Sequence, residues 1–267
     1  MFSAVPFRGN PVAVVLDADG LSTEAMQQFA NWTNLSETTF VLPPADSRAD
    51  YRVRIFTPAA ELPFAGHPTL GTCHAWLEAG GQPASPDVYL QECGAGLIQI
   101  RPTEAGLALA APPLIRSGPV DEPLAGRIAA QLGIARADMV DLAWADNGPG
   151  WVAVLLPTAE AVLALRPGVV DLDIGVAGPY PPGGPAAFEV RAFFPLAGST
   201  VEDPVTGSLN AALAGWLLST GRATAPYLAR QGTALGRAGQ VYISQEPGGQ
   251  IWVGGASRTY LSGEAEL

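Results

Sequence analysis

Cysteine is scarce in this sequence, because its 267 residues include only Cys73 and Cys93. Two thiols in a chain of this length do not make a disulfide framework, so we expect both to be free and buried. The sequence also lacks any run of about 18 apolar residues and any N-terminal signal-peptide pattern. We therefore expect a soluble, cytoplasmic protein that has no membrane partner.

Positive charge is also scarce, since 14 Lys and Arg face 25 Asp and Glu and the net charge is −11. No basic cluster is present, which argues against a nucleic-acid partner. No Walker loop, dinucleotide-binding glycine motif or nucleophile elbow occurs. The two histidines, His67 and His74, lie two helical turns apart and do not share a metal. We expect neither a cofactor nor a metal.

Glycine and proline are plentiful, at 31 and 25 residues, and they separate short segments that alternate between apolar and polar residues. Most of these segments are separated by turn residues rather than helices, which favours antiparallel or mixed sheets in an α+β protein. The expected strands are Pro11–Val15, Thr39–Leu42, Tyr51–Phe56, Val88–Glu92, Gly96–Arg101, Trp151–Leu156, Ala187–Phe193, Gln240–Ser244 and Gln250–Gly254.

Two predicted helices, Thr69–Ala79 and Ser208–Thr220, are apolar or small on nearly every face. A helix without a polar face is usually buried, so we expect a sheet curled around a central helix in each half of the chain. The expected lobes are residues 1–115 and 116–257, with a last strand at 258–267 returning to the first lobe. We expect Gly175–Pro185 to form a long surface loop.

The starts of these two helices resemble each other when the sequence is shifted by 136 positions. His67 then falls on Asp203, Gly71 on Gly207 and Thr72 on Ser208. A duplicated lobe would place a histidine and an aspartate at equivalent helix N-termini, as an acid/base pair facing one cleft. Ordinary capped helices are the alternative interpretation.

A helix N-terminus offers unpaired N–H groups and a partial positive charge, which suit an anion. Gly66 and Gly207 would allow the backbone to approach a ligand closely. Because the chain is acidic overall, we expect these two helix starts and His67 to bind a small carboxylate. Asp203 would then face a nearby donor group of the same substrate, such as an amine or hydroxyl.

Glu37 is a third candidate for proton transfer. It follows Leu35 and precedes Phe40 and Val41, which indicates a partly buried corner. A carboxyl group in such a corner has a raised pKa, which suits proton transfer near neutral pH.

Four segments together resemble the PhzF-like (phenazine-biosynthesis-like) isomerases, and the similarity extends over essentially the whole chain. They are Gly9–Val15, Asn34–Val41, Glu61–Gly71 and Glu202–Ser208. The resemblance implies the diaminopimelate-epimerase-like fold, in which two pseudo-symmetric lobes flank the active site. It also implies a homodimer and a cofactor-independent isomerase that moves a proton on a small carboxylate, as in the family's founding activity on a dihydro-hydroxyanthranilate.

The resemblance also implies roles for individual residues. The family's acid/base glutamate matches Glu37, and its histidine with the preceding glycine matches His67 and Gly66. Its second-lobe aspartate and serine match Asp203 and Ser208. These assignments make Glu37, Asp203 and His67 catalytic. The expected substrate-binding residues are Gly66, Gly207, Ser208 and Asn10.

One departure from the family concerns the beginning of the chain, where family members have a longer first strand before the segment that matches Phe2. Two other functions stay open. An amino-acid racemase or epimerase could share this fold, although the two cysteines that such enzymes use are missing from both helix starts. A non-catalytic protein that binds a small metabolite is the other alternative.

Overall fold

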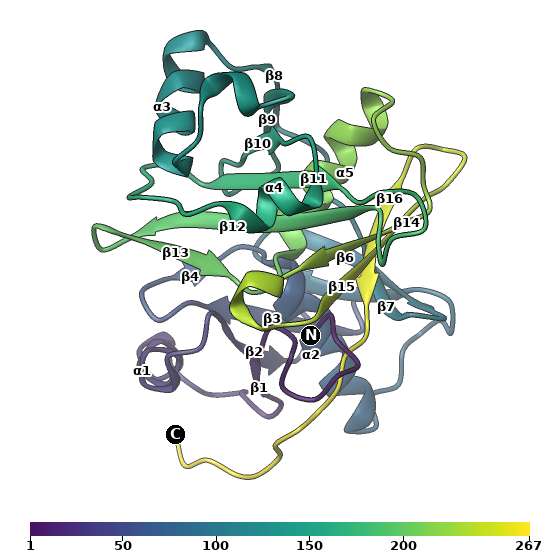
Figure 1. The fold of residues 1–267 in the computed structure, drawn as a ribbon. Helices are drawn as coiled ribbons and strands as arrows, with labels where there is room; N and C mark the ends of the chain where they lie inside the picture. Colours follow the sequence, from purple (N-terminus) through teal and green to yellow (C-terminus); the bar gives the residue numbers. More distant parts are fainter. The chain divides into compact units, whose positions relative to one another are not determined.

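The computed structural model describes residues 1–267, which divide into two compact units (Figure 1). Unit 1 consists of Met1–Ala110 and Gly254–Leu267, and unit 2 is Ala111–Val253. These boundaries differ by a few residues from the expected lobes. None of the helices is long and apolar enough to span a bilayer.

Unit 1 contains seven strands and two α-helices. Its sheet has the order β1-β2-β3-β5-β6-β7, and the short β4 pairs with β3. Cys73 and Cys93 are both buried here as free thiols. The elements are β1 (Ala13–Val15), α1 (Thr23–Thr33), β2 (Thr38–Leu42), β3 (Tyr51–Phe56), β4 (Glu61–Leu62), α2 (Gly66–Glu78), β5 (Tyr89–Cys93), β6 (Gly96–Thr103) and β7 (Gly106–Ala110).

Unit 2 has the strand order β15-β14-β12-β11-β10-β9-β8, and β13 pairs with β12. A last strand, β16 (Ile251–Gly255), crosses from unit 2 into unit 1. The other elements are β8 (Arg116–Pro119), α3 (Glu122–Leu132), η1 (Arg136–Asp138), β9 (Asp141–Asp146), β10 (Val152–Leu155), α4 (Ala159–Ala164), β11 (Ile174–Pro179), β12 (Phe188–Leu196), β13 (Ser199–Asp203), α5 (Gly207–Ser219), β14 (Tyr227–Gln231), η2 (Thr233–Leu235) and β15 (Gly239–Gln245).

The two sheets repeat one pairing pattern. In unit 1, β1 and β2 are parallel, β2 and β3 antiparallel, β3 and β5 parallel, and β5 and β6 antiparallel. In unit 2 the same four relations hold for β10, β11, β12, β14 and β15. Mixed sheets built from an internal duplication agree with the α+β class expected from the alternating segments.

Each sheet encloses a helix that is buried from its first turn. Helix α2 contacts β1, β2 and β7, and α5 contacts β9, β11 and β15. Strands from distant places in each sheet therefore meet one helix, as expected for a sheet curled around it. The other helices lie outside, where α1 covers a core containing Met26 and Phe40, and α4 packs against β11 and β12.

Local sequence signals account for the outer helices. Ser22 and Thr158 accept hydrogen bonds from the Ala25 and Ala161 backbone N–H groups, which caps the N-termini of α1 and α4. Gly133 ends α3 in the left-handed conformation, with a φ of 72°. Ser22, Thr158 and Gly133 are residue types that favour these helix ends.

The predicted offset of 136 residues between the helix starts is wrong. Phe56 lies opposite Glu61 in the first hairpin and Phe193 lies opposite Glu202 in the second. Helices α2 and α5 then begin at Gly66 and Gly207, so the true offset is 141 residues. The counterpart of His67 is therefore Ser208, and Leu62 is the counterpart of Asp203. Pro68 and Gly71 inside α2 have the same spacing as Pro204 and Gly207 at the start of α5. This match produced the incorrect alignment.

The prediction that Gly175–Pro185 is a surface loop is wrong for its first half, because Gly175–Pro179 belongs to the buried strand β11. The glycines there serve close packing rather than a turn. A Cβ atom on Gly175 would lie 2.0 Å from a Leu209 methyl group, and one on Gly178 would lie 2.3 Å from the Thr158 carbonyl oxygen. The irregular part of this segment begins at Tyr180.

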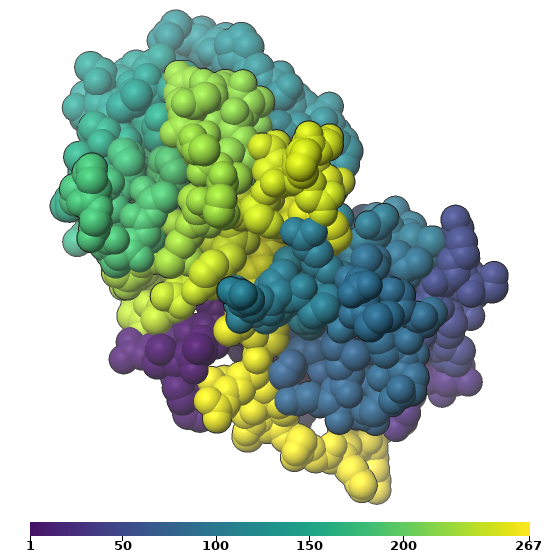
Figure 2. Space-filling model, turned by 90° about the vertical axis from the view of Figure 1, so that its right-hand side faces the viewer, coloured from purple at the N-terminus to yellow at the C-terminus, as the bar shows by residue number.

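The expected last strand at 258–267 does not form, because no strand follows β16. This segment has no partner strand and few apolar residues, and it lies on the surface of unit 1 (Figure 2). Thr259 donates a hydrogen bond to Glu78, and Tyr260 contacts the ring of Phe7. At the other end of the chain, no strand precedes Ala13.

Substitution of Gly175 tests the close contact between β11 and α5. We expect Gly175→Ala to lower the free energy of unfolding by about 1–3 kcal/mol, because the new methyl group would overlap Leu209. Gly126→Ala is the matched control, since nothing lies within 4 Å of that position in α3. Denaturant unfolding measures both, and equal stability of Gly175→Ala and wild type would contradict the packing described.

Candidate functional site

Glu37 and His67 meet in unit 1. Glu37 directly precedes β2, and His67 is the second residue of α2. The Glu37 Oε2 atom lies 3.3 Å from Nε2 of His67, and their side chains are 16% and 5% exposed. The expected partly buried corner therefore exists, and it contains a carboxylate that solvent still reaches beside a buried imidazole.

His67 is neutral at physiological pH. Burial lowers its pKa to about 3, and the nearby N-terminal ammonium acts in the same direction. Nε2 forms a hydrogen bond with the Pro11 carbonyl oxygen at 3.2 Å, and a carbonyl oxygen can only accept. We therefore place the single ring proton on Nε2. His67 serves as a hydrogen-bond donor rather than as a cation.

The first turn of α2 has no side-chain cap, because Ala65 occupies the N-cap position. The N-cap of α5, Thr206, makes no side-chain capping bond either. Uncapped N–H groups with a partial positive charge suit an anion. Gly66 begins α2, and Asn10, another expected binding residue, is buried one position before Pro11.

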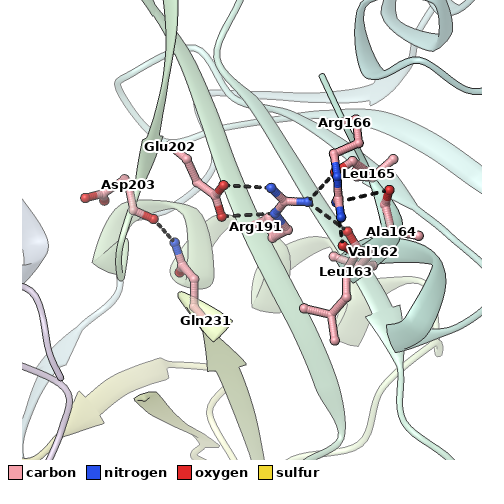
Figure 3. Close-up of polar contacts among 9 residues, drawn as sticks. All are labelled: Val162, Leu163, Ala164, Leu165, Arg166, Arg191, Glu202, Asp203 and Gln231. Atoms are coloured by element: carbon pink, nitrogen blue, oxygen red, sulfur yellow. Dashed lines mark hydrogen bonds and ion pairs between the residues drawn. The ribbon is translucent and has the colours of Figure 1, made fainter. Parts of the chain in front are cut away.

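Asp203 is the last residue of β13 and is held by a buried hydrogen-bond network in unit 2. Thr206 Oγ1 donates to Asp203 Oδ2 at 2.5 Å. Gln231 Nε2 donates to the Asp203 carbonyl oxygen at 3.0 Å, which Figure 3 shows, and to Thr206 Oγ1 at 2.8 Å. Gln231 Oε1 accepts from the Thr206 N–H and from Asn210. Every hydrogen-bonding group of the Gln231 amide is thus used.

The neighbouring Glu202 is fixed by a second polar cluster. Arg191 donates to both Glu202 oxygens, at 3.0 and 2.7 Å, and to the carbonyl oxygens of Val162 and Leu165 (Figure 3). Unit 1 has the same bidentate pair between Arg54 and Glu61. The approach to each central helix is therefore fixed by an arginine in the preceding strand.

Ser208 is held from two sides. The Trp151 indole N–H donates to its Oγ at 3.1 Å, and Asn147 Nδ2 donates to its carbonyl oxygen at 2.9 Å. Ser208 is the second residue of α5, directly after Gly207. This hydroxyl is therefore oriented by an indole, just as the His67 ring is oriented by the Pro11 carbonyl oxygen.

The structure brings the predicted residues together in two groups. Unit 1 holds Glu37, His67, Gly66 and Asn10, and unit 2 holds Asp203, Gly207 and Ser208. A single cleft that joins both groups stays a prediction. Sequence reasoning missed Thr206, Gln231, Trp151 and Asn147, because only the fold places them against the site. No group of three or more His, Cys, Asp or Glu side chains is arranged to hold a metal ion.

The chain belongs to the phenazine biosynthesis-like protein family, whose model matches residues 1–267. Antisense-enhancing sequence 1 of Schizosaccharomyces pombe is 37% identical, over 99% of this chain and 96% of the relative. Trans-2,3-dihydro-3-hydroxyanthranilate isomerase of Pseudomonas aeruginosa is 33% identical, over 100% of this chain and 97% of the relative.

A solved structure gives the same result for the fold. The crystal structure of a PhzF-family protein from Enterococcus faecalis aligns with a TM-score of 0.80 at 25% identity, covering 100% of this chain and 96% of that chain. The family and fold expected from the sequence are therefore confirmed. The expected enzyme class, a PhzF-like isomerase, agrees with the names of the curated relatives.

The depressed pKa of His67 predicts a pH-dependent stability. Unfolding restores an ordinary pKa near 6.5, so the unfolded state takes up the proton first and stability falls as the pH drops below that value. We expect a loss of about 2 kcal/mol between about pH 7 and pH 5 from this residue. His67→Gln should remove that part of the pH dependence.

His74→Gln is the matched control, because His74 lies on the same helix with 23% of its side chain exposed. Denaturant unfolding at each pH measures the effect. A His67→Gln variant with the same pH dependence as wild type would show that His67 is not buried as a neutral imidazole.

The hydrogen-bond network around Asp203 predicts that replacing Gln231 destabilises the folded protein. Gln231→Met should lower the free energy of unfolding by about 2–4 kcal/mol, because Asn210 and the Thr206 N–H lose a buried acceptor. Gln240→Met, at an exposed position of the neighbouring strand, should change it by less than about 0.5 kcal/mol. Equal effects in thermal or denaturant unfolding would argue against a buried network.

Proposed function

We propose that this protein is a cofactor-independent isomerase that moves a proton on a small molecule bearing a carboxylate, with Glu37 as the acid/base group. One observation carries the proposal, namely the 3.3 Å contact between the solvent-accessible Glu37 carboxylate and the buried His67. A carboxylate takes and returns a proton without a cofactor, and the neutral imidazole lies directly beside it.

His67 supports the reaction by packing against Glu37. Its Nε2 atom lies 3.3 Å from the Glu37 carboxylate, while its Nε2 proton is donated to the Pro11 carbonyl oxygen. When Glu37 carries the abstracted proton, Nε2–H retains the Pro11 carbonyl as an acceptor. The imidazole therefore stays in place in both states of Glu37.

The uncapped first turns of α2 and α5 support the carboxylate class, because their N–H groups are available to an anion. Asp203 and Ser208 supply an acceptor and an oriented hydroxyl for the same molecule. We use trans-2,3-dihydro-3-hydroxyanthranilate as the first candidate substrate, because a relative that matches the whole chain is named as its isomerase. Its name denotes a ring with a carboxylate, an amine and a hydroxyl. By the same family resemblance we propose a homodimer.

Hydrogen exchange with D₂O tests the acid/base role. Wild type should incorporate deuterium at carbon in trans-2,3-dihydro-3-hydroxyanthranilate, and Glu37→Gln should lower the rate by about 10²–10⁴-fold, because the amide accepts no proton. NMR or mass spectrometry follows the label. Glu104→Gln is the control, since this glutamate lies exposed in the turn between β6 and β7.

Full exchange by a folded Glu37→Gln variant would contradict the role of Glu37. Binding of this molecule without any exchange by wild type would favour the non-catalytic binding protein. Exchange at the carbon that bears an amino acid's carboxylate and amine, with inversion, would favour the racemase alternative.

A further inference from the structure

The internal duplication gives Glu37 a counterpart in unit 2. Thr38, the first residue of β2, lies opposite Phe56, and Ile174, the first residue of β11, lies opposite Phe193. The two phenylalanines are equivalent, because each lies opposite the glutamate of an Arg–Glu pair and beneath its arginine. The residue before β11 is Asp173. It therefore occupies the position that Glu37 has in unit 1.

The side chain of Asp173 lies on the face of β11 that meets α5. Successive residues of a strand point to opposite faces, so Asp173 shares a face with Gly175. Gly175 packs directly against Leu209 in the first turn of α5. Ile174, on the other face, belongs to the core that packs against α3 and α4. In unit 1 the equivalent face holds Thr39, whose hydroxyl accepts a hydrogen bond from Thr72 of α2.

The carboxylate of Asp173 lacks a hydrogen-bond donor. The structure contains no hydrogen bond to it, and the charged group that acts on it is another carboxylate, Asp146. Burial and that neighbour together raise the pKa of Asp173 to about 6. Asp146 uses its Oδ1 to accept from the Gly148 and Gly150 N–H groups, so it does not donate to Asp173.

A second acceptor without a hydrogen-bond partner belongs to Asn147, the residue after Asp146. Asn147 is 9% exposed, and its Nδ2 donates to the Ser208 carbonyl oxygen at the start of α5. That bond fixes the amide orientation and leaves Oδ1 as a buried acceptor without a hydrogen bond. A buried acceptor without a donor is costly, so a ligand N–H group that reached the Asn147 oxygen would be stabilised there.

We propose that Asp173 is a substrate-contacting residue that binds the amine of the isomerised molecule, and thereby selects amine-bearing carboxylates over carboxylates that lack an amine. The proposal rests on the isomerase function proposed above. A protonated amine supplies up to three donors and a positive charge, which suits Asp173, Asp146 and the Asn147 oxygen. No bond is made or broken in this step.

Binding of two matched probes tests the proposal. The probes are cis-2-aminocyclohexanecarboxylate and cyclohexanecarboxylate, which differ only in the amine, and calorimetry at about pH 7.5 gives their affinities. Wild type should bind the amine-bearing probe about tenfold or more tightly than the other. Asp173→Asn should lose most of this preference, and Asp173→Glu should keep part of it.

Asp171→Asn is the matched control, because this exposed aspartate lies two residues away and pairs with Arg127. It should keep the full preference. A structural role for Asp173 predicts a different result, namely a less stable Asp173→Asn variant. Removing a charge that has no partner should instead leave the thermal stability unchanged or raised.

Equal binding of the two probes by wild type, no binding of either, or an undiminished preference in Asp173→Asn would each overturn the proposal. The NMR signal of the Trp151 indole N–H reports whether the probe binds near Ser208, because this N–H donates to the Ser208 hydroxyl. It should shift when the amine-bearing probe is added. A failure of the isomerase proposal is recognised separately, as missing deuterium exchange in wild type while the amine preference persists.

Discussion

The bidentate pairing of an arginine with a glutamate, formed once in each unit, is the constraint on which the site depends. Each pair joins the two strands of one hairpin, β3 to β4 in unit 1 and β12 to β13 in unit 2. The central helix begins five residues after the glutamate. In unit 2 the Arg191 and Glu202 side chains are only 6% and 12% exposed, so loss of one partner would leave a buried charge unpaired. The pair fixes Glu202, and Asp203 is the next residue.

The same constraint explains why the candidate functional residues of the two units lie at equivalent positions of the duplicated fold. Once the hairpin register is fixed, the residue before the adjacent strand and the second residue of the central helix are fixed as well. Unit 1 uses these positions for Glu37 and His67, and unit 2 uses them for Asp173 and Ser208. An acid therefore occurs at the first position in both units, whereas the second position is an imidazole in unit 1 and a hydroxyl in unit 2. This difference is compatible with the proton transfer proposed for unit 1 and the ligand binding proposed for unit 2.

Much of this could be predicted from the sequence, because the signals are local. Ser22, Thr158 and Gly133 mark helix ends, and the apolar helices α2 and α5 are buried as expected. The offset of 136 residues failed because similarity of a few residues says nothing about hairpin length. Gly175–Pro179 was misread because glycine serves tight packing as well as turns. Gln231 and Asp173 were missed because their importance comes from partners distant in sequence, which only the sheet register reveals.

A crystal structure of Glu37→Gln with trans-2,3-dihydro-3-hydroxyanthranilate would test the proposed role of Glu37, because this variant should bind the molecule without converting it. We expect a ring carbon bearing a transferable proton within about 3.5 Å of the residue 37 side chain, with His67 still adjacent to that side chain. A ligand whose ring carbons all lie beyond the reach of residue 37 would contradict it.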